Sequence, residues 1–309
     1  MDLGADDTHD LNEIGKRIIL PSSYLGSSRS MYQLYQDSMA LACYFHKVDY
    51  FITMTANPNW PEIKNALLPG QQPSDRPDII ARVFNLKRNA FLDDLTKGGY
   101  LGHVLGYVYT IEFQKRGLPH MHLLLFIDHN SRPKEPADID KIISAEFPDP
   151  DIEPELFNLV LQNMTHGPCD QRCQVNGKYS KRFPKTFRDA TSMDQNAYVS
   201  YRRRDTGKTF CCHPNKPYDP KYDNCWVVPY NKVFLLSYQC HINIECCASI
   251  KSVKYIHKYI YKGHDRITMV IEDTLDEVKI YLDSRYISAP EGIWRLLELK
   301  MYAEVPKIY

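Results

Sequence analysis

Two β-type runs separated by a short loop constrain the fold of this chain more than any other feature. Residues 104–113 and 120–127 are rich in Val, Leu, Ile, Tyr and Phe, and the six residues between them read Gln-Lys-Arg-Gly-Leu-Pro. Strands so close in sequence pair as an antiparallel hairpin, because a parallel pair needs a crossover of a dozen or more residues. The sequence therefore predicts a sheet that contains this antiparallel hairpin.

The remaining segments alternate between helical and extended patterns. Four of them have apolar residues at helical spacing and predict helices: 30–47, 76–97, 154–164 and 249–261. Residues 49–55 alternate as a strand, and regular structure is also expected at 226–230 and 240–245. Two further helical segments are expected at the end of the chain. This mixture indicates an α+β fold with a central antiparallel sheet flanked by helices.

The hairpin places potential metal ligands together. Side chains alternate along a strand, so His120 and His122 share one face while Met121 points away, and Glu112 shares a face with Gln114. If the hairpin closes around residues 115–119, Gln114 lies opposite His120 and Glu112 opposite His122. Two imidazoles with a carboxylate or amide oxygen suit Mg²⁺, Mn²⁺ or a similar ion. The alternative is a structural histidine pair on a half-buried strand.

A second pattern follows in the run KYIHKYIYKG from Lys254. Tyr255 and Tyr259 are four residues apart, so on a helix they stand on one face, and Lys258 and Lys262 form a second such pair. A tyrosine can attack phosphorus, and nearby cations favour its phenolate and bind phosphate. The chain contains 22 tyrosines, so chance spacing is the alternative.

The amino-acid composition argues against three classes of protein: disordered, membrane-spanning and secreted disulfide-rich proteins. A hydrophobic fraction of 43% and a charged fraction of 25% exclude wholesale disorder. No run approaches the roughly 18 apolar residues of a membrane span, so we expect no membrane partner. Nine cysteines, with adjacent pairs at 211–212 and 246–247, do not resemble a secreted disulfide framework.

The charges are unevenly distributed, although the formal net charge is +0. Residues 172–266 carry 18 Lys and Arg against 7 Asp and Glu, a net of +11, whereas residues 128–155 carry 3 against 9, a net of −6. A basic block of this size is typical of a nucleic-acid footprint, and a solvated basic face is the alternative.

Taken together, these runs resemble a known family. The chain contains KRIILPSSYLGSSRSMYQLYQDSMAL, FITMTANPNWPEI, EFQKRGLPHMHLLLFI, WVVPYN, HINIE and KYIHKYIYKGHDR, in this order. Metal-binding HxH on a strand with later helical tyrosines is the arrangement of the HUH endonucleases. The set of runs looks like the Rep nuclease region of Helitron transposases, the two-tyrosine type, which implies a ferredoxin- or RRM-like core.

The resemblance also implies roles for individual residues. His120 and His122 match the metal ligands, with Glu112 or Gln114 as the third, and Tyr255 and Tyr259 match the nucleophiles. Lys258 and Lys262 would assist them. The residues expected to contact DNA are Asn57, Asn59, Trp60, Lys115, Arg116, Arg202, Arg203, Arg204 and Trp226.

The implied reaction is nicking and rejoining of single-stranded or locally melted DNA in a rolling-circle transposon. A tyrosine attacks phosphorus, leaving a 5′-phosphotyrosine and a free 3′-hydroxyl, while Mg²⁺ or Mn²⁺ stabilises the developing charge. The substrate implies the nucleus of a eukaryotic host. No GxxxxGK[ST] phosphate loop is present, so we expect an isolated nuclease module whose helicase domain is absent and whose unwinding comes from a separate helicase.

The expected domain organisation has four parts. Residues 1–29 form an N-terminal segment, 30–165 the first part of the nuclease domain, 166–224 an irregular Cys- and Lys/Arg-rich insertion, and 225–309 the second part. Within the insertion, His166, Cys169 and Cys173 resemble the start of a zinc site, and free thiols are the alternative.

Two other functions remain open at this point. One is a catalytically inactive remnant that still binds DNA. The other is a metal-dependent phosphodiesterase that activates water instead of tyrosine, and that would leave no covalent adduct.

Overall fold

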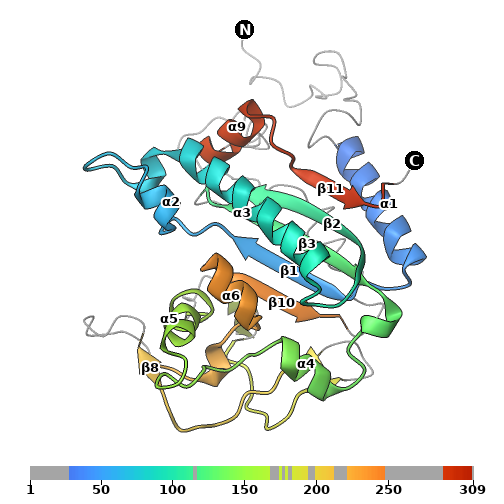
Figure 1. Ribbon diagram of the computed structural model, residues 1–309, viewed down its shortest axis with the longest axis vertical. Coiled ribbons are helices and arrows are strands. Elements are labelled where there is room, and N and C mark those ends of the chain that lie inside the picture. The colour runs from blue at the N-terminus through green and yellow to red at the C-terminus, as the bar shows by residue number, and fades with distance from the viewer. Residues whose placement is uncertain are drawn as a thin grey trace, which may run out of the picture.

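A computed structural model describes the protein over residues 28–113, 117–167, 174–175, 178–179, 183–193, 199–211, 221–247 and 288–307. Its centre is a five-stranded sheet in which every pair of neighbouring strands is antiparallel. In spatial order the strands are β10 (Ile242–Cys246), β1 (Tyr50–Thr55), β3 (Pro119–Ile127), β2 (Val104–Phe113) and β11 (Tyr302–Val305) (Figure 1). The predicted α+β fold with a central antiparallel sheet is confirmed.

The order of the strands explains why β3 is the most apolar. It lies between β1 and β2, so that β1, α3 (Pro77–Gly98) and β2 form a split β-α-β unit with β3 inserted. All nine residues of β3 are buried. A strand that is covered on both faces reads as a continuous apolar run. In PHMHLLLFI the two histidines interrupt that run, which marks them as unusual.

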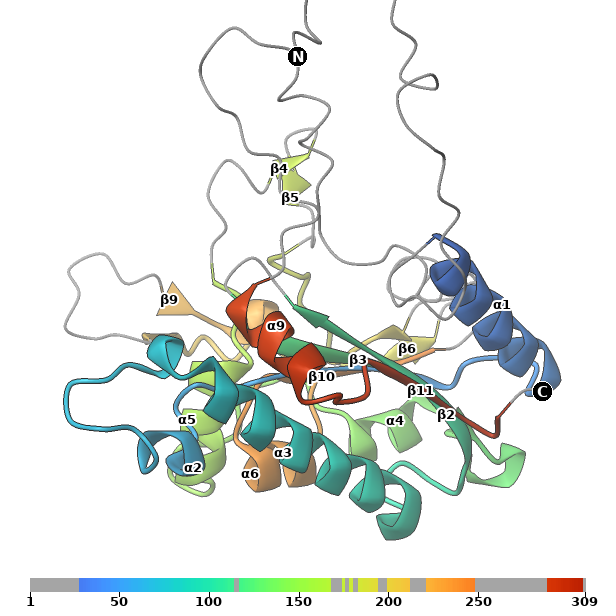
Figure 2. The same ribbon diagram turned by 90° about the horizontal axis from the view of Figure 1, so that it is seen from above.

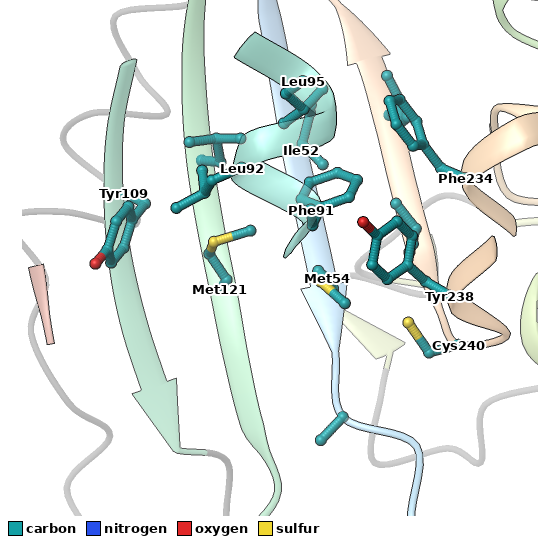
Figure 3. Packing of buried hydrophobic residues seen from close by; sticks show 14 of the residues in the cluster. Ile52, Met54, Phe91, Leu92, Leu95, Tyr109, Met121, Phe234, Tyr238 and Cys240 are labelled. Carbon is teal, nitrogen blue, oxygen red and sulfur yellow. The ribbon is translucent and has the colours of Figure 1, made fainter. Parts of the chain in front are cut away.

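One face of the sheet forms the main core beneath α3. Ile52, Met54 and Met121 point toward this helix, which contributes Phe91 and Leu95, all with almost no exposed surface (Figure 3). The Phe91 ring meets Phe234 at 5.0 Å and Tyr238 at 5.3 Å between centroids. These two rings come from α6 (Lys232–Tyr238), and Trp294 of α9 (Ala289–Leu296) joins the same cluster.

The other face is only partly apolar. Helix α1 (Ser28–Tyr44) packs Leu41 and Ala42 against Phe51, Leu124 and Phe126. Figure 2 shows α1 and α3 on opposite sides of the sheet. Strand residues of alternate parity therefore enter two different clusters, as side-chain alternation requires.

The remaining elements are short. The helical ones are α2 (Pro61–Lys64), η1 (Pro73–Asp75), η2 (His129–Ser131), α4 (Pro136–Ile142), α5 (Pro154–Asn163) and η4 (Asn224–Trp226). Three two-stranded ladders pair β4 (Gln174–Val175) with β5 (Lys178–Tyr179), β6 (Ser192–Met193) with β7 (Val199–Ser200), and β8 (Phe210–Cys211) with β9 (Lys221–Tyr222). A separate cluster of buried residues unites α5 and α6 with Val227 and Tyr230.

Several sequence-based expectations need correction. Residues 226–230 contain the end of η4 and two isolated bridges, at Val227 and Tyr230, not a regular strand. Helices α4 and α6 were not predicted. The last described element is the strand β11 and not a second helix, because it pairs with β2 across the sheet. The helix expected at 249–261 lies outside the described residues, and the four-part domain division stays a prediction.

Within the part of the chain that the structure describes, no helix has both the length and the apolar character needed to cross a membrane.

Candidate functional site

The hairpin register differs from the predicted one by two residues. Glu112 pairs with His120, Thr110 pairs with His122, and Phe113 pairs with Pro119. The strand β3 begins at Pro119, whose carbonyl oxygen accepts from the Ala56 amide at 3.0 Å. The loop is therefore 114–118, with Gly117 in the left-handed region at a φ of 79°. The expectation that Gln114 lies opposite His120 is wrong.

Glu112 nevertheless reaches His122. Its Oε2 lies 3.0 Å from His122 Nε2, although the residue directly across the ladder is His120. A diagonal partner on a neighbouring strand is within reach of a long side chain. The Glu112 side chain is 22% exposed and that of His122 is 10% exposed, so their contact is largely shielded from water.

Strand β1 contacts the same two histidines from the other side. Thr53 pairs with His122 and Thr55 pairs with His120 in the ladder. The Thr53 hydroxyl oxygen lies 3.1 Å from His122 Nδ1, and that of Thr55 lies 2.7 Å from His120 Nδ1. The Phe51 ring stacks on His122 with centroids 5.8 Å apart. Each imidazole is therefore held through its Nδ1 side.

These residues occupy the polar half of one sheet face. Beside the apolar cluster under α1, strand alternation places eight polar residues on this face: Thr53, Thr55, Thr110, Glu112, His120, His122, Asn243 and Glu245. Asn243 Nδ2 donates to Glu245 Oε1 at 3.2 Å. A dense polar group next to a packed core is typical of a functional site, because partly buried polar groups reduce stability unless they are paired.

The His122 and Glu112 pair has a spacing that suits a divalent cation. Adjacent ligand atoms of an octahedral Mg²⁺ site, each about 2.1 Å from the ion, lie about 3.0 Å apart. The observed separation of 3.0 Å is that of a hydrogen bond between the two atoms, and the same spacing is compatible with two ligands of one cation. Among the residues that the structure describes, however, no three His, Cys, Asp or Glu side chains are already gathered around one point.

The part of the chain that contains this site is similar to one known family of proteins. A family model described as a Helitron helicase-like domain at the N-terminus matches residues 2–125. Residues 2–125 are therefore similar to this family. We call them the Helitron-like segment, which contains Thr53, Thr55, Glu112, His120 and His122. The match supports a function related to that of Helitron transposases. A search of curated proteins found no match.

The expected nucleophiles lie outside both the Helitron-like segment and the described residues. Tyr255, Tyr259, Lys258 and Lys262 fall within 251–287, whose structure is not described. Gln114, Lys115 and Arg116 in the hairpin loop are inside the Helitron-like segment but outside the described residues, and Cys169 and Cys173 in the insertion are also outside the described residues. Their roles stay predictions.

The turn at residues 57–60, which follows β1 in the Helitron-like segment, is hydrogen-bonded to the end of α6. Asn57 Nδ2 donates to the Gln239 carbonyl at 2.6 Å, and Asn57 Oδ1 accepts from the Asn59 amide at 2.9 Å. Trp60 is 1% exposed, and its Nε1 donates to the Tyr238 carbonyl at 2.7 Å. Trp60 is thus a core residue, and the prediction that it contacts DNA does not fit its position. Asn59 is exposed.

The three consecutive arginines have different environments. Arg203 is 3% exposed and donates to the carbonyls of Ala145, Asn224 and Val227. Burial lowers the pKa of Arg203 to about 10. This side chain holds the insertion against the body of the protein, which corrects the prediction that it contacts DNA.

Arg202 and Arg204 flank Arg203 nearer the surface, where both meet Glu146. Arg204 donates twice to this carboxylate, at 2.7 Å to Oε2 and 3.0 Å to Oε1, and Arg202 lies 3.4 Å from Oε2. Burial raises the pKa of Glu146, but the hydrogen bonds from Arg204 outweigh this effect and bring the pKa below its usual value. Trp226 is half-buried with its ring 6.0 Å from that of Tyr222.

The zinc hypothesis gains no support from the described residues. His166 packs its ring 4.5 Å from that of Phe183, and its backbone amide donates to the Trp226 carbonyl. Burial raises the pKa of the nearby Cys225 to about 11, so this residue is a neutral thiol at pH 7.

Sequence reasoning missed Thr53 and Thr55. The signal was present, because FITMT repeats Thr with the same period of two as the histidines in HMH. What the sequence did not show is that the two strands are neighbours in matching register.

Proposed function

We propose that this protein is a metal-dependent endonuclease and strand transferase for single-stranded DNA, belonging to a Helitron-like rolling-circle transposon. One observation supports this most: His120, His122 and Glu112 share one sheet face inside the Helitron-like segment, with Glu112 at 3.0 Å from His122. Two imidazoles and a carboxylate are donors that can hold a divalent cation.

Glu112, His120 and His122 would hold Mg²⁺ or Mn²⁺ at this face. The bound cation supplies charge stabilisation at a non-bridging oxygen of the scissile phosphate. Phe51 and the two threonines keep the imidazoles from rotating away.

Tyr255 or Tyr259 would then act as the nucleophile. Its phenolic oxygen forms a bond to phosphorus while the bond from phosphorus to the 3′ oxygen breaks, and the departing oxygen takes up the proton that the phenol has lost. The products are a 5′-phosphotyrosine and a 3′-hydroxyl. Lys258 and Lys262 would favour the phenolate. Because the linkage remains a phosphodiester, the strand can be rejoined to another 3′ end without ATP.

The DNA must be single-stranded or locally melted for its backbone to reach such a site, so a separate helicase is the expected partner, in the nucleus of a eukaryotic host. Arg202, Arg204 and Trp226 lie in the described basic region and would bind the strand by charge and stacking.

A denaturing gel for a covalent protein–DNA adduct tests the proposal. Labelled single-stranded oligonucleotides are incubated with the protein and Mn²⁺, beside EDTA and the variants His120→Ala/His122→Ala, Tyr255→Phe and Tyr259→Phe. His129→Ala and Tyr44→Phe are matched controls, since both residues are exposed and outside the site.

We expect an adduct that requires metal, is lost with the paired histidines and with one tyrosine, and survives both controls. Cleavage without an adduct would favour a phosphodiesterase that activates water. Binding without cleavage, across several metals and DNA pools, would favour an inactive DNA-binding remnant.

A further inference from the structure

The two threonines of β1 contact the histidines in a repeated arrangement. Thr53 faces His122 and Thr55 faces His120, each as a direct ladder partner. In both pairs the hydroxyl oxygen meets Nδ1, at 3.1 Å and 2.7 Å respectively. One such contact could be incidental, whereas the same contact made twice at the period of the strand points to a shared role.

The hydrogen bonds to the threonines distinguish the two nitrogens of each imidazole: Nδ1 contacts the hydroxyl, and Nε2 is left to meet a cation. When Nδ1 contacts a hydroxyl, the ring can rotate only by losing that hydrogen bond, and Nε2 is the atom that would meet a cation. His122 shows this directly, because its Nε2 faces Glu112 Oε2 while its Nδ1 faces Thr53. Partners of this kind orient metal-binding histidines and raise their affinity for the ion.

A hydroxyl at this position has a property that a carbonyl or a carboxylate lacks. It can both donate and accept a hydrogen bond. It therefore partners Nδ1 whether the ring proton is on Nδ1 or on Nε2. A neutral imidazole whose Nε2 donates to Glu112 carries its proton on Nε2, and one whose Nε2 binds a cation carries it on Nδ1. The hydroxyl keeps the ring in place in both tautomers.

We propose that Thr53 and Thr55 are positioning residues that orient His122 and His120 for binding a divalent cation. The inference rests on the proposed function, since it requires that these histidines bind a metal ion. It goes further by assigning the role to the side-chain hydroxyls of β1, which neither contact the substrate nor ligate the ion.

The test measures Mn²⁺ binding by isothermal titration calorimetry with the full chain and no DNA. The variants are Thr53→Val and Thr55→Val, which keep the shape and the β-branch but lose the hydroxyl, and Thr53→Ser and Thr55→Ser, which keep the hydroxyl. Thr53→Ala and Thr55→Ala are a second hydroxyl-free pair in case a valine variant does not fold. Thr165→Val is the control, because its hydroxyl donates to the Val160 carbonyl away from the site.

We expect each valine change to raise the Mn²⁺ dissociation constant about 10-fold or more, in the range for partners of metal-binding histidines. The serine variants should stay within about 3-fold of the wild type, and so should Thr165→Val. A purely structural role would instead lower the melting temperature without changing the dissociation constant.

Three results would overturn the inference, and they are distinguishable. If the wild type binds Mn²⁺, His120→Ala/His122→Ala does not, and the valine variants bind like the wild type, the positioning role is refuted while the metal site stands. If serine weakens binding as much as valine does, the hydroxyl is not responsible. If the wild type binds no Mn²⁺, the proposed function fails and the inference fails with it.

Discussion

Replacing Arg203 by Met separates a structural arginine from a DNA-binding one. Met has a similar length and no charge, so the change removes the donors to the Ala145, Asn224 and Val227 carbonyls without leaving a large cavity. The Asn224 carbonyl also accepts from the Val227 amide, so the change removes this donor from the two carbonyls that matter most, those of Ala145 and Val227. At about 3 kcal/mol each, the upper end for a hydrogen bond with a charged donor, the loss is about 6 kcal/mol.

The cost of burying the guanidinium offsets part of this loss. A fall in pKa from 12.5 to about 10 corresponds to unfavourable burial on the order of 3 kcal/mol, which the Met variant recovers. The net destabilisation is therefore about 3 kcal/mol. At about 2.1 cal/mol/K of unfolding entropy per residue, a chain of this length loses about 5 °C in melting temperature.

The assay is thermal unfolding followed by circular dichroism, together with the affinity for single-stranded DNA. Arg204→Met is the matched variant, since Arg204 is exposed. We expect Arg203→Met to lower the melting temperature and Arg204→Met to lower the DNA affinity. The pKa of Arg203 is lowered in the folded state, so its burial penalty is constant below about pH 10, and the difference in melting temperature should not change between pH 6 and 9. An unchanged melting temperature for Arg203→Met, with DNA affinity reduced as in Arg204→Met, would refute the reasoning.

Three further predictions follow from the described residues. Trp60→Ala should cost about 3–5 kcal/mol in thermal unfolding, whereas Asn59→Ala should not change the melting temperature; equal effects would contradict the placement of Trp60 in the core. Folding lowers the pKa of Glu146, so the carboxylate contributes stability above pH 4.5, and this contribution is lost as the pH falls through the folded-state pKa. The free energy of unfolding of Glu146→Gln should therefore fall less steeply with acid than that of the wild type. An unchanged slope would count against the pair with Arg204. Mn²⁺ at 100 times its dissociation constant should stabilise the wild type by about 2.7 kcal/mol in a thermal-shift assay and leave His120→Ala/His122→Ala unchanged, while an equal shift in both would place the metal elsewhere.

The strands of the hairpin could be predicted from the sequence, but their register could not. Residues 104–113 form one uninterrupted β-type run, and the structure has β2 at the same bounds. The register depends on where the loop closes, and the residue types of the loop do not determine that point. The strand β3 begins at Pro119, whose carbonyl accepts from the amide of Ala56, a residue far away in sequence. The predicted pairing of Gln114 with His120 therefore failed, although Glu112 was correctly placed near His122.

Contacts to the backbone account for most of the other differences between the sequence-based predictions and the structure. Arg203 can be buried because three backbone carbonyls accept its hydrogen bonds. Every residue has such a carbonyl, so the sequence does not show which ones will lie near an arginine. Strand β11 has only four residues, and its extended conformation comes from pairing with β2. Thr53 and Thr55 became visible as partners of the histidines only when β1 was placed beside β3.

The central claim is that a tyrosine of this chain attacks DNA under the control of the metal site on the sheet. The most direct measurement is tandem mass spectrometry of the protein after incubation with single-stranded DNA and Mn²⁺ and digestion with protease and nuclease. The account predicts a peptide carrying a nucleotide on Tyr255 or Tyr259, absent with EDTA and absent from His120→Ala/His122→Ala. Cleaved DNA without any modified tyrosine peptide, or the same modification in the histidine variant, would contradict it.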